Sequence, residues 1–388
     1  MTATVTPLSS RQGSLQTKGQ QVAPAFSSVT IVVPTYKEAE NLPYLIDQIG
    51  DVREALGIPI DLLIMDDDSR DGSVEVVEAR SEPWVEIVVR TSDRAHSAAV
   101  LDGMRRARGE VLVCMDADLS HPPQALPHML SKLEAGADFV IGSRYVDGGS
   151  TADDWSFLQW LNSRVATALA RPLTNVADPM AGFFALRRST FEQGRDLAPV
   201  GYKIGLELLL KCGCERVVEV PIHFEDRRFG QSKLTVRQQL LYLRHLRRLY
   251  IFKYGAWSQL TQFLVVGGLG TIVNLVVLTN LMALRIPVQI AVATAILVAM
   301  TFNFVLNRRF SFSLSRGGSW PRQFVSFVAA SSFAALINYG TTLLALGQIT
   351  VRPQIAALLG IAAGTMFNFV ASRYLVFRTS HIRPKLHD

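Results

Sequence analysis

The first 226 residues alternate short apolar runs with longer polar stretches. The apolar runs lie at 29–33, 60–65, 85–89, 111–115 and 139–141. Runs of this length are typical of buried strands, and a helix is expected after the first of them, from about Glu38. Strands that alternate with helices build mostly parallel sheets covered by helices. The pattern therefore predicts an α/β domain with a Rossmann-like, mostly parallel sheet.

Four long apolar segments occupy the last third of the chain. They lie at about 260–282, 288–307, 323–346 and 353–376. Each is near the ~20 residues that a helix needs to cross a bilayer, so an all-α domain of four transmembrane helices is expected. Basic residues gather between the second and third segments and around the end of the fourth, whereas the other two connections contain only Arg285 and Arg352. The positive-inside rule therefore predicts that both termini and the α/β domain face the cytoplasm.

Residues 234–254, between these two regions, show helical periodicity. One stripe of this helix contains Arg237, Arg244, Arg247 and Arg248, and the opposite one contains Tyr242, Leu243, Leu246, Leu249 and Tyr250. Such a helix can lie on an anionic membrane surface. It can also be an ordinary amphipathic helix that packs on the sheet domain, and the sequence leaves both readings open.

The membrane segments contain an internal repeat. The stretch 262–274 aligns with 323–338, and 301–312 aligns with 366–377, at a spacing of about 64 residues. The region is therefore a duplicated unit of two helices. The asparagines that recur at matching places are Asn274, Asn303, Asn338 and Asn368. An unpaired amide is costly at hydrocarbon depth, so these side chains are expected either to bond between helices or to line a path for lipid or sugar.

Charge is divided unevenly along the chain. Residues 1–226 contain 32 acidic and 21 basic residues, whereas residues 227–388 contain 18 basic residues and a single acid, Asp388. The basic half is mostly apolar and lacks clustered base-stacking positions, which indicates a membrane domain and argues against a nucleic-acid partner. The three cysteines lack the spacing of a zinc finger, so reduced thiols are expected.

These patterns divide the chain into four parts. Residues 1–27 are polar and lack the apolar core of a secretion signal, so a disordered tail is expected there. The α/β domain is expected at 28–233, the amphipathic helix at 234–256 and the transmembrane domain at 257–380.

Two carboxylates follow the apolar run at 111–115. Asp116 and Asp118 are one residue apart, and alternate side chains of an extended chain point the same way, so both can hold one divalent cation. The same residues also suit a strand-to-helix turn, with Pro122 in the first helical turn. Three other expected strands end in polar or constrained segments, at 34–38, 66–69 and 142–144. Ligands of such sheets bind at the carboxyl ends of the strands, which favours a binding site.

Seven motifs, in order, resemble those of the family 2 glycosyltransferases of the GT-A fold. They are VPTYKEAENL (33–42), DDDSRDGS (66–73), MDADLSHPP (115–123), GSRY (142–145), DPMAGFF (178–184), GYKIGLELLLK (201–211) and FEDRRFGQSKL (224–234). Within that family the motifs are most similar to those of the dolichol-phosphate mannose synthases and their bacterial polyprenyl-phosphate relatives. The repeated tail resembles GtrA-like four-helix membrane domains, and the resemblance covers about residues 29–378.

The resemblance implies a donor site built around Mg²⁺ or Mn²⁺. Asp116 and Asp118 would bind the ion together with the diphosphate of a nucleotide sugar, whose negative charge grows as the sugar departs. Ser120 stands where relatives often have a glutamine ligand, which makes it the third candidate ligand. The residues implied in nucleotide binding are Pro34, Tyr36, Glu38, Asp66, Asp67, Asp68 and Asp116. Because three acids stand in succession, Asp66 could take the nucleotide-binding role in place of Asp67 or Asp68.

The resemblance also implies a cationic site for a lipid phosphate. An anion that approaches another anion needs positive side chains to hold it. The implied set is Arg144, Ser163, Arg164, Arg227, Ser232 and Lys233. A phosphate oxygen is already ionised at neutral pH, so no catalytic base is required, and Asp116, Asp118 and Arg144 are the residues expected to carry the reaction.

The implied reaction is the inverting transfer of one hexose to polyprenyl (dolichyl-type) phosphate at the cytoplasmic face of a membrane. GDP-mannose is the expected donor and UDP-glucose is the alternative. A processive polysaccharide synthase shares the fold, but residues 227–257 lack the Gln-x-x-Arg-Trp motif of that class. A non-catalytic lipid-sugar carrier built from the repeat is disfavoured by the intact acidic and basic motifs.

Overall fold

The computed structural model describes residues 26–151, 157–198, 200–225, 236–312, 319–348 and 353–377. The tail expected at 1–27 lies almost wholly outside the described residues. The chain divides into two units, Met1–Leu246 and Arg247–Asp388. The domain boundaries expected at 233 and 256 stay predictions.

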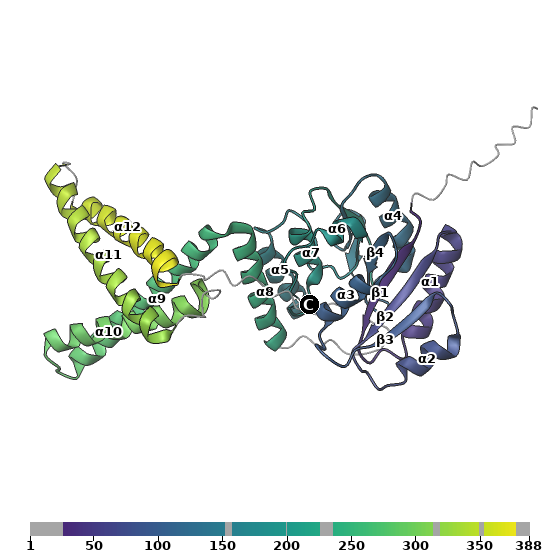
Figure 1. Ribbon diagram of the computed structural model, residues 1–388, viewed down its shortest axis with the longest axis horizontal. Helices are drawn as coiled ribbons and strands as arrows, with labels where there is room; N and C mark the ends of the chain where they lie inside the picture. Colours follow the sequence, from purple (N-terminus) through teal and green to yellow (C-terminus); the bar gives the residue numbers. More distant parts are fainter. Residues whose placement is uncertain are drawn as a thin grey trace, which may run out of the picture. The chain divides into compact units, whose positions relative to one another are not determined.

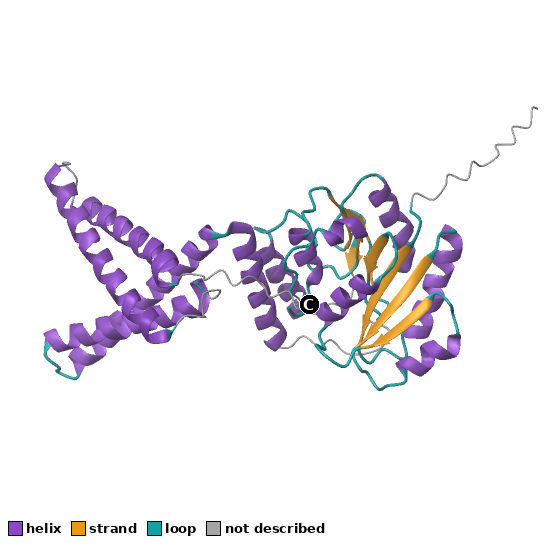
Figure 2. Ribbon diagram, in the orientation of Figure 1, coloured by secondary structure: helices purple, strands orange, loops and turns teal. Residues whose placement is uncertain are grey.

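The first unit is built on a seven-stranded sheet with the order β3-β2-β1-β4-β7-β5-β8 (Figures 1 and 2). Its strands are β1 Val29–Thr35, β2 Ile60–Asp66, β3 Val85–Val89, β4 Val111–Cys114, β5 Phe139–Ser143, β7 Phe184–Arg187 and β8 Val217–Pro221. All neighbours are parallel except β7, which runs antiparallel to both β4 and β5. Two short strands, β6 Ser150–Thr151 and β9 His223–Phe224, pair with each other in parallel. The predicted fold class is confirmed.

Helices cover both faces of this sheet. They are α1 Leu42–Leu56, α2 Ser73–Arg80, α3 His96–Arg106, α4 Leu126–Glu134, α5 Phe157–Ala170, α6 Arg188–Glu192 and α7 Ile204–Lys211. Alternation along β1 divides the core, because Ile31 and Val33 pack with α1 and α4 whereas Val32 packs with α3 and α7. The first helix begins at Leu42 and not at Glu38, since Lys37 has a positive φ of 62° and Pro43 suits only the first helical turn.

Helix α8, Val236–Tyr254, packs on the first unit through one face. The Tyr242 hydroxyl donates a hydrogen bond to the Ala166 carbonyl of α5 over 2.8 Å. His245 is buried with its Nδ1 3.7 Å from Glu207 of α7, and the neighbouring Leu243 is half exposed. This packing supports the ordinary amphipathic helix, and contact of the exposed face with a membrane surface stays a prediction.

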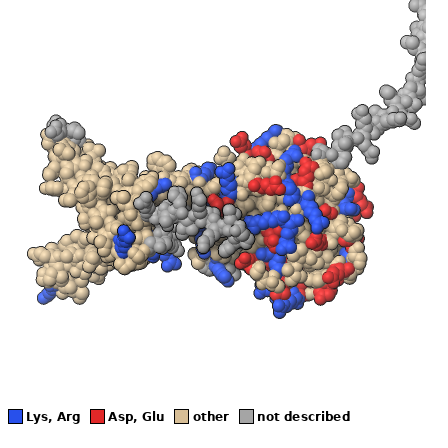
Figure 3. All heavy atoms as spheres, viewed as in Figure 1, with Lys and Arg blue, Asp and Glu red and all other residues tan. Residues whose placement is uncertain are grey.

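The second unit contains four helices long and apolar enough to cross a membrane. They are α9 Ala256–Ala283, α10 Val288–Leu306, α11 Trp320–Gln348 and α12 Pro353–Ala371. Large apolar side chains such as Leu264, Leu336 and Leu358 are exposed, as expected for surfaces that face lipid. On the face drawn in Figure 3 the long helices are almost free of charge, whereas Asp, Glu, Lys and Arg are interspersed over the first unit. The chain is a membrane protein.

The duplication seen in the sequence is also structural. Helix α9 packs on α10 and α11 packs on α12, and each pair ends in a π-helical turn, η2 Asn307–Ser311 and η4 Ser372–Val376. Phenylalanines from both repeats form one buried cluster, in which Phe304 and Phe369 hold matching positions, as do Phe312 and Phe377.

Candidate active site

A cavity of about 840 Å³ opens at the carboxyl ends of strands β1, β2 and β4. Ligands of open α/β sheets bind at this edge. The lining includes Pro34, Tyr36, Glu38, Asp67, Arg94, His96, Asp116, Asp118, His121, Arg144, Ser163, Gly182, Tyr202, Lys203 and Phe224. The cavity therefore brings together most of the residues predicted to hold the donor with two of those predicted to hold the acceptor.

Asp116 and Asp118 follow the end of β4 and both line the cavity. The turn between them and the next helix is tight, because Leu119 adopts a positive φ of 64°. Ser120 is fully buried, and its hydroxyl donates a hydrogen bond of 2.6 Å to Oδ1 of Asp118. Its backbone N–H donates to the same oxygen over 3.2 Å. Ser120 thus lies behind Asp118 and orients that carboxylate toward the cavity.

Asp116 lies among positive or polarisable neighbours. Burial alone would raise the pKa of its carboxyl, but His121, His96 and Lys203 together lower it well below its usual range. His96 Nε2 is 3.1 Å from Oδ1 of Asp116. The Asp116 backbone N–H donates to Nδ1 of His121 over 2.9 Å, and the His121 ring is stacked on Phe183 at 5.3 Å. Asp116 is therefore an anion at neutral pH, and His121 supports its backbone.

A glycine leaves room beside these carboxylates. A Cβ added to Gly182, in the DPMAGFF motif, would lie 3.2 Å from Oδ2 of Asp116 and 3.2 Å from the His121 ring. No set of three His, Cys, Asp or Glu side chains converges as a metal cage among the described residues. The protein thus offers two carboxylates from one turn, and this oxygen donor set fits a hard divalent cation that takes its remaining ligands from a diphosphate and water.

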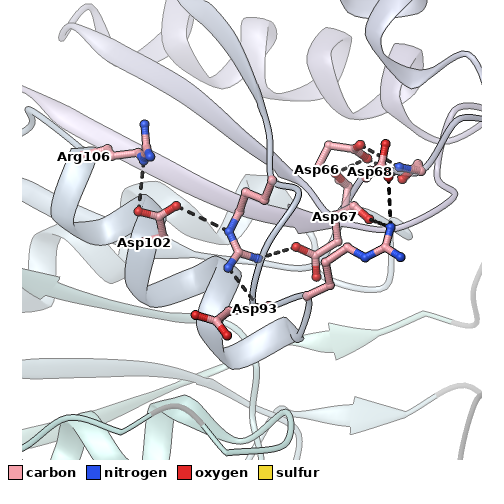
Figure 4. A network of polar contacts seen from close by, with 10 residues as sticks. Asp66, Asp67, Asp68, Asp93, Asp102 and Arg106 are labelled. Carbon is pink, nitrogen blue, oxygen red and sulfur yellow. Dashed lines mark hydrogen bonds and ion pairs between the residues drawn. The ribbon is translucent and has the colours of Figure 1, made fainter.

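The three consecutive acids after β2 have three different environments (Figure 4). Asp66 is buried and accepts hydrogen bonds from Thr35 and from the Ser69 N–H, at 3.3 and 2.9 Å. Asp68 adopts a φ of 55° and pairs with Arg70 and Arg94 at 2.9 and 3.1 Å. Of the three, only Asp67 lines the cavity.

Asp67 is held by a buried arginine. Arg90 donates to the Asp67 carboxylate and also lies 3.4 Å from Asp102 of α3, which Arg106 contacts at 3.0 Å (Figure 4). Burial outweighs the attraction of Arg90, so the pKa of Asp67 is raised. The network ties the end of β2 to α3 and positions Asp67 at the cavity wall.

Arg144 is a fixed cation in the wall of the same cavity. Its Nε and Nη2 donate to the two oxygens of Asp178 at 2.7 and 2.9 Å, and its backbone N–H donates to the same carboxylate. Asp178 is fully buried, which would raise its pKa, but the Arg144 bonds outweigh burial and lower it. The Arg144 guanidinium also lies 5.1 Å from the Phe224 ring. The two hydrogen bonds to Asp178 hold the guanidinium in one orientation at the cavity.

The remaining residues predicted to bind the acceptor are divided. Ser163 on α5 lines the cavity, and its hydroxyl is 2.7 Å from that of Tyr145. Arg164 is exposed, stacks on Tyr145 at 5.8 Å and does not line the cavity. Arg227, Ser232 and Lys233 lie outside the described residues.

Sequence reasoning missed His96, Arg94 and Lys203. His96 begins α3, after the loop that follows β3, so the rule that ligands gather at strand ends is the signal that points to it. Lys203 lies in the GYKIGLELLLK motif and donates to the Met180 carbonyl over 2.6 Å. Its place in the cavity depends on a contact between distant segments, which no local pattern predicts.

Two family models match the chain. Residues 30–195 match "Glycosyl transferase family 2", and residues 262–377 match "GtrA/DPMS, transmembrane domain". A dolichol-phosphate mannosyltransferase of Pyrococcus furiosus is 36% identical over 358 residues, which cover 90% of this chain and 99% of the relative.

Two further relatives match a smaller share of the chain. A dolichol-phosphate mannosyltransferase of Mycosarcoma maydis is 41% identical over 59% of this chain and 81% of its own length. A polyprenol monophosphomannose synthase of Mycolicibacterium smegmatis is 38% identical over 53% of this chain and 80% of its own length. The chain therefore belongs to the dolichol-phosphate mannosyltransferase family and is a family 2 glycosyltransferase with a GtrA/DPMS transmembrane domain.

Proposed function

We propose that this glycosyltransferase transfers one mannosyl group from GDP-mannose to a polyprenyl phosphate, with inversion, at the cytoplasmic face of the membrane. The names of its relatives support the sugar and the lipid class. The observation that carries the chemistry is a single cavity with the Asp116 and Asp118 carboxylates and the locked Arg144 guanidinium on its wall. Such a cavity suits a reaction between two phosphate-bearing substrates.

The donor half would consist of the turn after β4 and the loop after β1. Asp116 and Asp118 would hold Mg²⁺ or Mn²⁺, which neutralises the charge of the departing diphosphate. Pro34, Tyr36 and Glu38 line the cavity next to Asp67 and would hold the nucleoside. Ser120 acts here by orienting Asp118, and Asp66 by bracing the turn.

The acceptor half would be organised by Arg144 and Ser163. Two hydrogen bonds to Asp178 hold the planar guanidinium of Arg144 at the cavity wall, so little side-chain entropy would be lost when a phosphate binds there. Arg164, Arg227, Ser232 and Lys233 complete the set by resemblance. The acceptor phosphate oxygen forms its bond to the anomeric carbon as the bond to the nucleoside diphosphate breaks, and no group needs to remove a proton.

The test is nucleotide release by the purified full-length protein. With Mg²⁺ or Mn²⁺, GDP release from GDP-mannose is expected only after polyprenyl phosphate is added. Asp118→Asn is expected to lower turnover by at least about 100-fold, because neutralising a ligand weakens the metal clamp. Asp61→Asn, at an exposed position of β2, is the matched control and should keep wild-type turnover.

Two outcomes would contradict parts of this proposal. Absence of lipid-dependent nucleotide release with any nucleotide sugar would overturn it. Preference for UDP-glucose would replace mannose with glucose and leave the roles of the residues unchanged.

A further inference from the structure

The connection between α5 and β7 forms part of the wall of the active-site cavity. Met180, Ala181 and Gly182 of this connection line the cavity, and Asp178 holds Arg144 there. All of residues 171–183 are described, and none of them belongs to a helix or a strand. The hydrogen bonds of this backbone must therefore come from side chains and from other segments.

Glu219 of β8 holds the backbone of this connection at one place. Its Oε2 accepts a hydrogen bond from the Ala177 N–H over 2.7 Å, and its Oε1 accepts one from the Asp178 N–H over 3.0 Å. A carboxylate is a stronger acceptor than a neutral oxygen, and here both of its oxygens are bonded to successive backbone donors. Glu219 therefore fixes the position from which the Asp178 side chain starts.

These contacts continue to the cation of the cavity. The two oxygens of Asp178 accept hydrogen bonds from Nε and Nη2 of Arg144, at 2.7 and 2.9 Å. Arg144 directly follows β5, and β5 pairs in parallel with β8, with Ile141 opposite Glu219. The Glu219 carboxylate, the backbone and carboxylate of Asp178 and the Arg144 guanidinium thus form one chain of contacts from the edge strand β8 to the cavity wall.

The part of the connection at Gly182, beside Asp116, has different supports. The Lys203 ammonium donates to the Met180 carbonyl over 2.6 Å. Strand β7 begins two residues after Gly182 and is paired with β4 on one side and β5 on the other. Loss of the carboxylate on β8 is therefore expected to disturb the acceptor side of the cavity more than the donor side.

We propose that Glu219 is a positioning residue for the acceptor phosphate: it fixes the backbone at Asp178 and thereby sets the place and orientation of the Arg144 guanidinium. That this guanidinium binds the acceptor rests on the function proposed above. In Glu219→Gln one oxygen becomes an NH₂ group, which cannot accept from the backbone N–H in front of it. The backbone must then shift to relieve the lost bond, and Arg144 shifts with Asp178.

The test separates the two substrates in the steady-state kinetics of the purified full-length protein. Glu219→Gln is expected to raise the KM for polyprenyl phosphate by at least about 10-fold, since a small displacement of a binding group can cost as much as about 100-fold. The KM for GDP-mannose is expected to stay at its wild-type value, whereas a general loss of structure would change both. Glu86→Gln, at an exposed position of β3, is the matched control and should change neither KM.

Two further variants show whether the effect passes through Arg144. Glu219→Asp keeps the charge but is one methylene shorter, so it should raise the KM for polyprenyl phosphate less than Glu219→Gln, and it replaces that variant if the latter fails to fold. In an Arg144→Lys background the planar pairing with Asp178 is already lost, so adding Glu219→Gln should change this KM little further. Equal effects of Glu219→Gln in the wild-type and Arg144→Lys backgrounds would overturn the proposal.

Hydrogen exchange at the backbone amides of residues 171–183 gives a readout that needs no turnover. Exchange in this segment should be faster in Glu219→Gln than in Glu86→Gln, because the amides at 177 and 178 lose an anionic acceptor. Unchanged exchange, or an unchanged KM for polyprenyl phosphate, would overturn the proposal. Absence of lipid-dependent nucleotide release in the wild-type protein would contradict the proposed function instead, and the exchange measurement would still decide whether Glu219 holds this backbone.

Discussion

At the scale of single residues, the buried pair of Arg144 and Asp178 gives the clearest energetic prediction. Asp178→Asn would leave a buried guanidinium without its countercharge, and breaking such a pair typically costs about 3–5 kcal/mol. The unfolding temperature of the purified protein is expected to fall accordingly. Asp47→Asn is the control, because Asp47 pairs with Arg80 at the surface, where an ion pair contributes only about 0–1 kcal/mol. Equal decreases in unfolding temperature for the two substitutions would contradict the stabilising role of the buried pair of Arg144 and Asp178.

The same pair has a predictable pH dependence. The folded protein lowers the pKa of Asp178 below its ordinary value of 3.8, so the stabilisation is fully present above that value and is lost as the pH falls through the lower, folded pKa. The difference in unfolding temperature between wild type and Asp178→Asn should therefore be constant from neutral pH to about pH 5 and shrink below about pH 4. A difference that shrinks near neutral pH would point to another group.

The site was predictable where it depends on local geometry. Asp116 and Asp118 follow a strand and alternate, and the structure places both on the cavity. Choosing among Asp66, Asp67 and Asp68 was not possible from sequence, because each carboxylate is held by contacts with residues from other segments, such as Thr35 for Asp66 and Arg90 for Asp67. His96, at the start of α3, lies 3.1 Å from Asp116, and this distance depends on how α3 packs on the sheet.

At the scale of elements, contact between α3 and the sheet requires a glycine. A Cβ on Gly103 would lie 2.9 Å from Cγ of Met65 and closer still to Val32, and both side chains are fully buried. Gly103→Ala is therefore expected to destabilise the protein by about 1–3 kcal/mol through overpacking. At Gly50 of α1 the added Cβ would lie 3.6 Å from Trp84, an ordinary contact.

Gly50→Ala is accordingly the control for Gly103→Ala. An alanine in a helix interior is favoured over glycine by about 0.5–1 kcal/mol, so this variant should be as stable as wild type or more stable. Urea or thermal unfolding measures both, and a Gly103→Ala protein as stable as Gly50→Ala would show that the helix can move off the sheet.

Elements were predictable in proportion to their length and periodicity. The five apolar runs became β1 to β5, and the four long apolar segments became α9 to α12. Strand β7 was not foreseen, because Phe184–Arg187 is only four residues long and enters the sheet between β4 and β5 through a long-range antiparallel pairing. Strand β7 begins two residues after Gly182, which lies next to Asp116. The pairing of β7 in the sheet therefore helps to position Gly182 at the site.

At the scale of the whole molecule, the distribution of basic residues predicts how the chain crosses the membrane. The connection between α9 and α10 contains a single basic residue, Arg285. Three arginines, Arg308, Arg309 and Arg322, lie among the described residues next to the connection between α10 and α11. The connection between α9 and α10 is therefore expected on the outer side of the membrane. The connection between α10 and α11 is expected in the cytoplasm, and so is the first unit. This orientation can be tested by labelling single introduced cysteines with a membrane-impermeant maleimide.

The native cysteines make a favourable background for that measurement. Burial raises the pKa of Cys212 to about 11 and that of Cys214 to about 12, and Cys114 is fully buried, so few thiolates are available to react near neutral pH. Arg285→Cys should be labelled in intact cells and Arg322→Cys only after the membrane is permeabilised, since both positions are exposed in the fold. The reverse pattern would place the first unit on the outer face. There a cytoplasmic nucleotide sugar could not reach Asp116 and Asp118, so the labelling also tests whether the proposed donor can reach its site.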